Sequence, residues 1–480
     1  MKILRVWYAP VLSFFCALGV VAEAQRPNIL FLFADDMGWN GTQATGSDFY
    51  KTPNLDQLSK EGMTFTHAYS SGANCVPSRA CLMSGQYTPR HGRYGVRDPV
   101  NFKKPASQKS LLKMRLKPVL DSLSLPKDSP TIAEALSEAG YATGCFGKWQ
   151  NGKGKENSAK GRGFSVATDE NALKEKVNDD PKGVYSVAAD VCDFMETHRD
   201  RPFFAYVSYH GIHSPLQARP ETLKRFQHKE PGKLHNHPLY AACTYDLDDS
   251  AGIILKKLDQ LGLRENTIVV FSSDNGGVRS SMEALRGAKG CYYEGGIRVP
   301  LFVRWPGIIT PGTQCSVPVN NIDFYPTFLA LAGSAAPEGK LLDGANMLPL
   351  FTGAKSLERD SLFWHYPGYQ SVPVPRGRDT VFRTPPVSVM RKGDWKLHLF
   401  YEEWVLDGGS QDPAGSKAVE LYNLKDDPGE HSNLAARKSG KRDELLADLL
   451  AWLKETGAPM PSEPNPAYDP PEPAGTQEKQ

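Results

Sequence analysis

Short apolar runs that alternate with a helical pattern constrain the fold of this chain more than any other feature. Residues Asn28 to Ala34 form the first run, and Pro202 to Tyr209 and Thr267 to Phe271 follow it. Between the last two runs, Leu239 to Leu263 has the apolar period of an amphipathic helix. Buried strands that alternate with helices build a mainly parallel sheet with helices on both faces. The sequence therefore predicts an α/β fold, with its polar motifs at the ends of the strands.

The pattern changes after Asp360. Val387 to Arg391 and Trp395 to Leu399 are apolar segments on either side of a Gly-Asp turn, which predicts an antiparallel hairpin. Lys441 to Lys454 predicts a helix. We therefore expect a smaller C-terminal α+β subdomain that contains an antiparallel sheet.

The chain of 480 residues exceeds the size of one small domain, so a large domain followed by a smaller one is expected. The tail from Ala458 is rich in Pro and Glu, a composition typical of disorder. Two polar stretches, residues 101–130 and 151–163, are predicted to be loops at the rim of a cleft. The predicted divisions are a signal peptide over residues 1–24, a large domain over 25–359, a C-terminal subdomain over 360–457 and a disordered tail over 458–480.

The N-terminus has the pattern of a secretory signal. Lys2 and Arg5 precede an apolar run from Val6 to Val21, and Ala22-Glu23-Ala24 provides a small-x-small cleavage site. The protein is therefore expected to be secreted or periplasmic. No later apolar run is long enough to span a bilayer, so no membrane span is predicted. The formal net charge of +2 gives no reason to propose a nucleic-acid partner, although a basic pocket can lie inside a balanced total.

The stretch with the most specific chemistry is Cys75-Val76-Pro77-Ser78-Arg79. A cysteine in Cys-x-Pro-Ser-Arg can be oxidised to formylglycine (3-oxoalanine), whose aldehyde hydrates to a gem-diol. One hydroxyl can attack the sulfur of a sulfate ester, and the second lets sulfate leave as the aldehyde forms again. A buried thiol beside a proline turn is the alternative interpretation of this motif.

The other cysteines are predicted to be free thiols. Cys16 lies in the predicted signal, and Phe14 and Phe15 before it are not the small residues that a lipid-attachment site needs. The remaining six are even in number, which permits disulfides. Their irregular spacing does not match a zinc site, and a chain of this size does not need disulfides to be stable. They are Cys81, Cys145, Cys192, Cys243, Cys291 and Cys315.

Motifs along most of the chain carry a resemblance to a known family. Arg26 to Gly38, which reads RPNILFLFADDMG, begins it, and Glu420 to Glu430, which reads ELYNLKDDPGE, ends it. In these motifs and their order the chain resembles the formylglycine-dependent (type I) sulfatases, an arylsulfatase-like branch of the alkaline phosphatase superfamily. The resemblance implies an alkaline-phosphatase-like large domain that hydrolyses sulfate esters.

Four oxygen-bearing side chains follow two of the predicted strands. Asp35 and Asp36 come after the first strand, and Asp274 and Asn275 come after the third. Carboxylate and amide oxygens suit a hard divalent cation, although Asp and Asn are also common turn residues. The resemblance implies that these residues, with the group formed from Cys75, bind one Ca²⁺. Mg²⁺ is the alternative ion.

Cationic side chains must stabilise the sulfuryl oxygens as charge moves to the leaving group. Arg79 lies four residues after Cys75, so on a helix the two share a face and the guanidinium can hold the nucleophile. The resemblance implies a catalytic role for Lys148, in a Gly-Lys-Trp segment, and for Lys289, shortly before Tyr293-Glu294-Gly295-Gly296. A merely solvated position is the alternative for each of these cations.

A departing sugar or aryl oxygen needs a proton. His213, in a Gly-Ile-His-Ser-Pro segment, matches the histidine that supplies this proton in the family, so the resemblance implies that it is catalytic. His210, three residues earlier, is a weaker candidate for contact with the substrate. Asp274 is expected to help activate the diol. For a lone histidine after a strand, a structural role is the alternative.

One position departs from the family pattern. The segment Gly140 to Trp149 should be followed by a histidine, and Gln150 stands there instead. Glutamine forms hydrogen bonds but carries no proton near neutral pH. The consequence is a slower step, a substitute base such as His210, or a degenerate enzyme. We interpret Gln150 as a substrate contact that adapts an active enzyme to a particular substrate.

The segment Leu362 to Pro367 resembles one that brings the C-terminal subdomain to the cleft in carbohydrate-active members of the family. His365, within it, is therefore predicted to contact the sugar. A packed aromatic strand is the alternative interpretation.

A secreted chain with polar loops and no membrane anchor favours a sulfated mono- or oligosaccharide over a steroid or a lipid as substrate. The expected function is therefore that of a carbohydrate sulfatase, and Cys75 implies a formylglycine-generating maturation enzyme as partner. Two other functions stay open. One is a phosphate or phosphonate ester hydrolase of the same superfamily, and the other is a sulfated-glycan binder that has lost turnover at Gln150.

Overall fold

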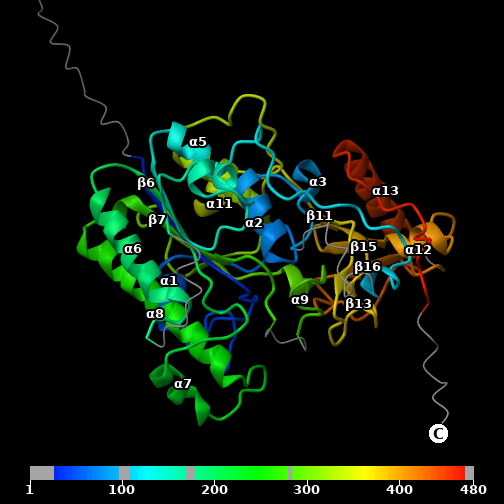
Figure 1. Ribbon diagram of the computed structural model, residues 1–480, viewed down its shortest axis with the longest axis horizontal. Coiled ribbons are helices and arrows are strands. Elements are labelled where there is room, and N and C mark those ends of the chain that lie inside the picture. Colours follow the sequence, from blue (N-terminus) through cyan, green and yellow to red (C-terminus); the bar gives the residue numbers. More distant parts are fainter. Residues whose placement is uncertain (1–25, 97–108, 169–178, 279–283, 414, 471–480) are drawn as a thin grey trace, which may run out of the picture.

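The computed structural model describes residues 26–96, 109–168, 179–278, 284–413 and 415–470. It contains a large sheet with helices on both faces and, beside it, a smaller sheet built by the C-terminal part of the chain (Figure 1). The signal peptide predicted over residues 1–24, together with Cys16, lies outside the described residues.

The large sheet has eight strands in the order β5-β4-β6-β1-β7-β8-β2-β9. The strand β1 (Asn28–Ala34) lies near its middle and is buried along its whole length. It is parallel to β6 (Phe203–Ser208) on one side and to β7 (Thr267–Ser273) on the other, whereas β8 is antiparallel to both of its neighbours. The predicted mainly parallel sheet is therefore confirmed. The other strands are β2 (Met63–Phe65), β4 (Ala142–Gly147), β5 (Val166–Ala167), β8 (Leu301–Arg304) and β9 (Thr313–Cys315).

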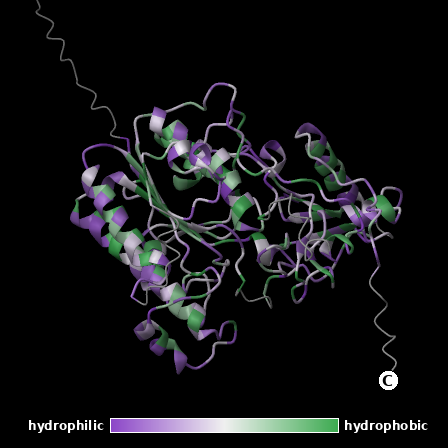
Figure 2. Ribbon diagram, viewed as in Figure 1, coloured by the Kyte–Doolittle hydropathy of each residue, from purple (hydrophilic) through white to green (hydrophobic). Residues whose placement is uncertain are grey.

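Helices cover both faces of this sheet because β1 is apolar at every position but the first. Successive side chains of a strand point to opposite faces, so Ile29 and Phe31 join one core while Leu30 and Leu32 join the other. The covering helices carry both hydrophobic and hydrophilic residues (Figure 2). The first core includes α2 (Cys75–Ser84), α5 (Ile132–Glu138) and α10 (Phe324–Leu331), and the second includes α1 (Pro53–Glu61), α6 (Val184–Thr197) and α8 (Pro238–Gln260).

The smaller sheet is antiparallel, with the order β11-β14-β15-β16. The strands β14 (Val387–Lys392) and β15 (Trp395–Phe400) form the predicted hairpin. The predicted C-terminal helix is α13 (Ser439–Glu455), and its Leu445 and Leu449 join one core with residues of the sheet. The outer strands are β11 (Ser361–Tyr366) and β16 (Val419–Asn423).

A two-stranded ribbon connects the C-terminal part to the segment that follows β7. Its strands are β12 (Gln370–Ser371) and β13 (Phe382–Thr384), and Thr384 Oγ1 donates to the Gly290 carbonyl at 2.7 Å. The shorter elements are β3 (Ala68–Tyr69), β10 (Val319–Asn320), α3 (Thr88–His91), α7 (Pro220–Gln227), α9 (Glu294–Ile297), α11 (Leu348–Phe351) and α12 (Tyr401–Leu406).

The disorder predicted from Ala458 onward is wrong for residues 458–470. The side-chain amide of Asn465 donates to the carbonyls of Leu111 and Met114, both at 2.8 Å. These hydrogen bonds fasten the tail to a loop more than 300 residues earlier in the chain, and composition alone contains no signal for them. Residues 471–480 lie outside the described part of the chain.

None of the seven cysteines among the described residues is in a disulfide, which agrees with the prediction for the six other than Cys75. No helix in the described part of the chain is long and apolar enough to cross a membrane.

Candidate active site

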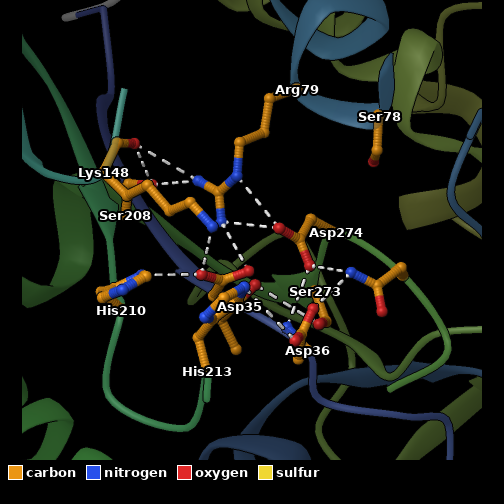
Figure 3. A network of polar contacts seen from close by, with 12 residues as sticks. Asp35, Asp36, Ser78, Arg79, Lys148, Ser208, His210, His213, Ser273 and Asp274 are labelled. Carbon is orange, nitrogen blue, oxygen red and sulfur yellow. Dashed lines mark hydrogen bonds and ion pairs between the residues drawn. The ribbon is translucent and has the colours of Figure 1, made fainter. Parts of the chain in front are cut away.

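The oxygen-bearing side chains predicted to bind a cation meet at the carboxyl ends of β1 and β7 (Figure 3). Asp35 and Asp36 follow β1, while Asp274 and Asn275 follow β7. The backbone N–H of Asp36 donates to Asp274 Oδ1 at 3.0 Å. One carboxylate oxygen from each of the three aspartates lies within 4.8 Å of the others. We call Asp35, Asp36 and Asp274 the acid cluster.

A local turn lets two consecutive aspartates face the same point. In an extended strand, successive side chains would point to opposite faces. Asp36 has a φ of 66°, so the backbone leaves the extended conformation directly after Asp35. Both carboxylates therefore enter the acid cluster.

The acid cluster has the chemistry of a divalent cation site. Its aspartates are at most 2% exposed, and Asp35 Oδ1 is buried without a hydrogen-bond partner in the described part of the chain. Carboxylates held this close repel one another unless positive charge lies among them. Asn275 adds a carboxamide, whose Nδ2 lies 2.8 Å from Asp36 Oδ1 and 2.7 Å from Asp274 Oδ1. Ligands of this kind suit Ca²⁺.

Cys75 is the first residue of α2 and lies against the acid cluster. Its Sγ, an oxygen of Asp35 and a ring nitrogen of His213 are within 4.8 Å of one another. The side chain is only 2% exposed, and burial raises the pKa of the thiol. Because the thiolate is the reactive form, unmodified Cys75 is a weak nucleophile near neutral pH.

Arg79 lies one turn further along α2 and is fully buried. Its Nε and Nη2 donate to Asp274 Oδ2 at 3.0 and 2.7 Å. Its Nη1 donates to the Tyr206 hydroxyl at 3.2 Å and also to Ser208 Oγ. The guanidinium therefore fastens α2 to β6 and β7 and holds Cys75 over the acid cluster.

Two lysines bind the other two carboxylates of the acid cluster. Lys148 Nζ is 2.5 Å from Asp35 Oδ2, and Lys289 Nζ is 2.7 Å from Asp36 Oδ2. With Arg79 they provide three cations for three carboxylates, so the formal charges balance. Lys148 and Lys289 both act electrostatically on the Cys75 side chain, so an anionic group formed at this position would meet their positive charge. Figure 3 shows Lys148 and Arg79 beside Asp35.

The charges in this cluster shift the pKa values of its members. Burial would raise the pKa of Asp35, but Lys148 and a hydrogen bond from His210 outweigh it and hold this pKa well below its ordinary value. Burial, with the charge of Asp35, raises the pKa of Asp274. Burial would lower the pKa of Lys148, but Asp35 outweighs it and raises this pKa. Lys148 is therefore a permanent cation at neutral pH.

His210 and His213 follow β6, and their rings stack with centroids 4.8 Å apart. His213 Nδ1 lies 2.6 Å from the Ser214 carbonyl oxygen, so this nitrogen donates a hydrogen bond there. The other nitrogen, Nε2, faces the acid cluster at 3.8 Å from Asp36 Oδ2. His210 Nδ1 lies 2.9 Å from Asp35 Oδ2. Burial lowers the pKa of both imidazoles.

Gln150 comes two residues after Lys148, just beyond β4. Its φ of 56° is a costly conformation for a residue other than glycine. Its Oε1 is buried and has no hydrogen-bond partner among the described residues. The residue as a whole is only partly buried, and the interpretation of Gln150 as a substrate contact stays a prediction.

His365 does not reach the site, and its prediction as a sugar contact is wrong. It is 1% exposed on β11, with its ring between those of Tyr94 and Tyr401. Its Nδ1 bonds Ser388 Oγ at 2.7 Å, and its Nε2 donates to the Pro459 carbonyl at 3.2 Å. Both ring nitrogens therefore have protein partners, and burial lowers the pKa of His365 to about 3. The packed-strand alternative describes it correctly.

Sequence reasoning missed two residues of the site. Ser208 Oγ donates to the Lys148 carbonyl at 2.6 Å and accepts from Arg79. The end of a predicted strand was the signal that could have identified it. Lys182 is 5% exposed and donates through Nζ to the His213 carbonyl. It lies in a stretch without periodicity, so only the folded chain brings it to the site.

This arrangement suits one class of chemistry. The cations can hold the oxygens of a sulfate or phosphate ester, and the acid cluster can hold a divalent ion beside them. His213 Nε2 faces the space in which the leaving oxygen would need a proton. The fold and the site therefore define a hydrolase of anionic esters.

The family follows from comparison with known proteins. The sulfatase family model matches residues 27–334, and the model for the C-terminal region of N-sulphoglucosamine sulphohydrolase matches residues 288–457. The chain belongs to the sulfatase family, and it is a sulfuric ester hydrolase. The resemblance found in the sequence is thereby confirmed.

The relatives match along most of the chain. A sulfatase of Formosa agariphila is 31% identical over 530 residues, which cover 91% of this chain and 90% of that protein. Human arylsulfatase A is 30% identical over 485 residues, which cover 89% of this chain and 87% of that one. The crystal structure of Ps i-CgsB has a TM-score of 0.70 at 27% identity, covering 92% of this chain and 95% of that one. It is also known in complex with k-i-k-neocarrahexaose.

Proposed function

We propose that this sulfatase removes sulfate from a sulfated sugar or glycan, with formylglycine formed from Cys75 and one bound Ca²⁺. The observation that carries the proposal is the gathering of Cys75 Sγ, an Asp35 oxygen and a His213 nitrogen within 4.8 Å. A nucleophile made from this side chain lies between the cation ligands and the proton donor. The complex of Ps i-CgsB with an oligosaccharide supports a sugar as the substrate.

When present, formylglycine supplies a gem-diol nucleophile and Ca²⁺ supplies positive charge at the ester oxygens. The acid cluster and Asn275 would hold the ion. Arg79 orients residue 75, because it fastens the first turn of α2 to Asp274. Asp274, whose Oδ2 accepts from Arg79 at 2.7 Å, accepts the proton of the attacking group.

The remaining site residues act on the ester and on its leaving group. Lys148 and Lys289 hold the sulfuryl oxygens as negative charge shifts. His213 donates a proton from Nε2 to the leaving oxygen, while the Ser214 carbonyl keeps its Nδ1–H in place. Gln150, which is only partly buried, contacts a hydroxyl of the sugar through its side-chain amide.

The proposal includes export and maturation. Residues 1–24 direct the chain out of the cytoplasm, so the mature enzyme is secreted or periplasmic. A formylglycine-generating enzyme recognises Cys75 to Arg79 and oxidises the cysteine. Residues 25–359 are proposed as the catalytic domain, with residues 360–457 as its C-terminal subdomain.

Free sulfate released from a panel of sulfated mono- and oligosaccharides tests this function. The protein is used after peptide mass has confirmed conversion of Cys75. Cys75→Ala is the control because it removes the nucleophile and keeps the acid cluster. We expect release from the converted protein alone. If converted protein binds sulfated sugars and releases no sulfate, the protein is a sulfated-glycan binder that has lost turnover at Gln150. Release of phosphate in place of sulfate would identify a phosphate ester hydrolase.

The calcium ion is tested by elemental analysis and by chelation. We expect one calcium per chain. Because the ion binds only the folded site, its removal should lower the midpoint of thermal unfolding, and added Ca²⁺ should restore it. Asp35→Asn, which removes one carboxylate, should retain less calcium. Magnesium in place of calcium would contradict the choice of ion.

A further inference from the structure

Three cationic side chains around the site share one kind of contact. Each donates a hydrogen bond to the backbone carbonyl of a predicted site residue, and none forms an ion pair with a carboxylate of the described residues. A carbonyl orients a cation without cancelling its charge. The pairs are Arg93 with Gln150 at 3.5 Å, Lys182 with His213, and Arg383 with Lys289 at 2.8 Å.

Arg383 differs from the other two cations in its exposure. Arg93 is 8% exposed and Lys182 is 5% exposed, so both are enclosed by the protein. Arg383, on β13, is only partly buried. It is therefore the cation of the three that a bound solute can reach.

The Arg383 side chain is held in place beside Lys289. Its stem lies on Gly290, where a Cβ atom would come within 2.6 Å of Arg383 Cδ. Its Nε donates to the Val372 carbonyl at 3.1 Å, and its Nη1 donates to the Lys289 carbonyl at 2.8 Å. Among the residues that the structure describes, these contacts use two of the five N–H donors of the guanidinium and leave Nη2 for another partner. A group fixed in this way loses little freedom when it binds an anion.

The charge of Arg383 exceeds what a single sulfate requires. The three carboxylates of the acid cluster are already balanced by the three cations that bind them. Lys289 contacts Arg383 through its carbonyl and Asp36 through its ammonium group, so the guanidinium lies one lysine side chain away from the acid cluster. Charged substituents on one sugar ring, or on neighbouring rings, are separated by a similar span.

We propose that Arg383 binds a second anionic group, a sulfate or a carboxylate, on the same sugar chain as the sulfate that is removed. The inference rests on the proposed function and makes the substrate a polyanionic glycan. The planar fork of a guanidinium can bind either oxyanion through two hydrogen bonds.

Binding of sucrose octasulfate, a polyanionic sugar, tests this inference without turnover. Arg383→Met removes the guanidinium and keeps the apolar stem on Gly290. Arg201→Met is the matched control, because Arg201 also donates to a backbone carbonyl, that of Gly140 at 3.0 Å, but lies before β6, at the opposite end of the strands. We expect Kd to rise about tenfold in Arg383→Met and less than about twofold in Arg201→Met. Equal Kd values for the two variants would overturn the proposal.

Turnover then separates this inference from the proposed function. The ratio of kcat/KM for a disulfated sugar to that for its monosulfated form should fall about tenfold in Arg383→Met, mainly through KM, and Arg383→Lys should restore part of it. A monosulfated disaccharide that carries a uronate tests whether a carboxylate serves as the second anion. An equal loss on all these substrates would mean that Arg383 only positions Lys289, and would overturn the proposal. If no substrate is hydrolysed but sucrose octasulfate binding still depends on Arg383, the proposed function fails and this inference stands.

Discussion

At the scale of single residues, the proposed role of His213 as the proton donor depends on the protonation state of its ring. Its Nδ1–H is engaged by the Ser214 carbonyl, so a proton on Nε2 requires the imidazolium form. Burial lowers the pKa of His213 below its ordinary value of 6.5; Lys148 and Lys289 act in the same direction, and Asp35 and Asp36 oppose them. The acid is therefore lost at a lower pH than for a histidine in water.

We expect kcat/KM to fall as pH rises through this lowered pKa, on the acid side of 6.5, because neutral His213 has no proton on Nε2. His213→Gln should remove this limb of the pH profile and lower kcat for sugar sulfates by about 10²- to 10⁴-fold. An aryl sulfate with a good leaving group serves as the control, because the variant should lose less activity on this substrate. A variant that keeps the wild-type pH profile would exclude His213 as the acid.

The Gln150 side chain yields a second prediction. Its Oε1 has no hydrogen-bond partner among the described residues, and a rotation of this partly buried side chain would bring the oxygen to a substrate hydroxyl. Gln150→His should therefore lower kcat/KM on the preferred sugar about tenfold or more, since the imidazole does not offer an amide oxygen at the same point. The measurement is sulfate release from that sugar, with binding of inorganic sulfate as the control for an intact site. A large gain in activity would indicate instead that the glutamine replaces a functional histidine of the family and has no role of its own.

At the scale of elements, α2 is the helix whose attachment decides the geometry of the site. Arg79 joins it to β7 through Asp274 and to β6 through Tyr206 and Ser208. All of these contacts are buried. Removing one partner of a charge pair enclosed in this way costs much stability, because the other charge stays buried and cannot be hydrated.

Arg79→Met should lower the free energy of unfolding by about 3–5 kcal/mol, because Asp274 would stay buried without its cation. Lys257→Met is the control for an exposed pair: Lys257 Nζ lies 2.7 Å from Glu196 in a pair with side chains 26% and 54% exposed. Loss of this exposed pair should change the stability far less. Denaturant unfolding measures both changes. Adding Asp274→Asn to Arg79→Met should recover part of the loss, and equal effects of the two single substitutions would contradict this account.

At the scale of the whole molecule, a buried charge network joins the smaller sheet to α9, in the segment that follows β7. Lys396, on β15 of the smaller sheet, lies 3.0 Å from Glu294 and 3.0 Å from Glu430. Glu294 opens α9, in the segment that carries Lys289 into the site. Both carboxylates and the ammonium are at most 1% exposed. The smaller sheet is therefore linked, through Lys396 and Glu294, to the segment that contains Lys289.

Lys396→Met should lower stability by about 3–5 kcal/mol, because two buried carboxylates would lose their shared cation. It should also lower kcat/KM, since the segment between Lys289 and Glu294 would no longer be fixed. The matched control is Lys392→Met on the same sheet, whose partner Asp448, at 2.9 Å, belongs to a pair that is 35% and 40% exposed. Thermal unfolding and sulfate release measure the two effects. If Lys396→Met proved as stable and active as Lys392→Met, the network would not connect the smaller sheet to the active-site segment.

Several features could be predicted because their signals are local. The apolar run of β1 and the Gly-Asp turn between β14 and β15 indicate strands through neighbouring residues alone. The meeting of Asp35 with Asp274 follows from one rule, since parallel strands end at the same edge of a sheet. The prediction that His365 contacts the sugar was wrong, because a sequence pattern places a residue on a strand and does not show which core receives its side chain.

The sequence by itself determined the chemistry of the centre. The Cys75 motif, the acidic strand ends, His213 and the departure at Gln150 depend only on residue type and order, and they are present before the chain folds. Only the tertiary structure decided that Lys182 and Arg383 reach the site, that His365 does not, and that residues 458–470 are packed. Those outcomes depend on contacts between segments that are far apart in the chain, and such contacts leave no periodic signal in the sequence.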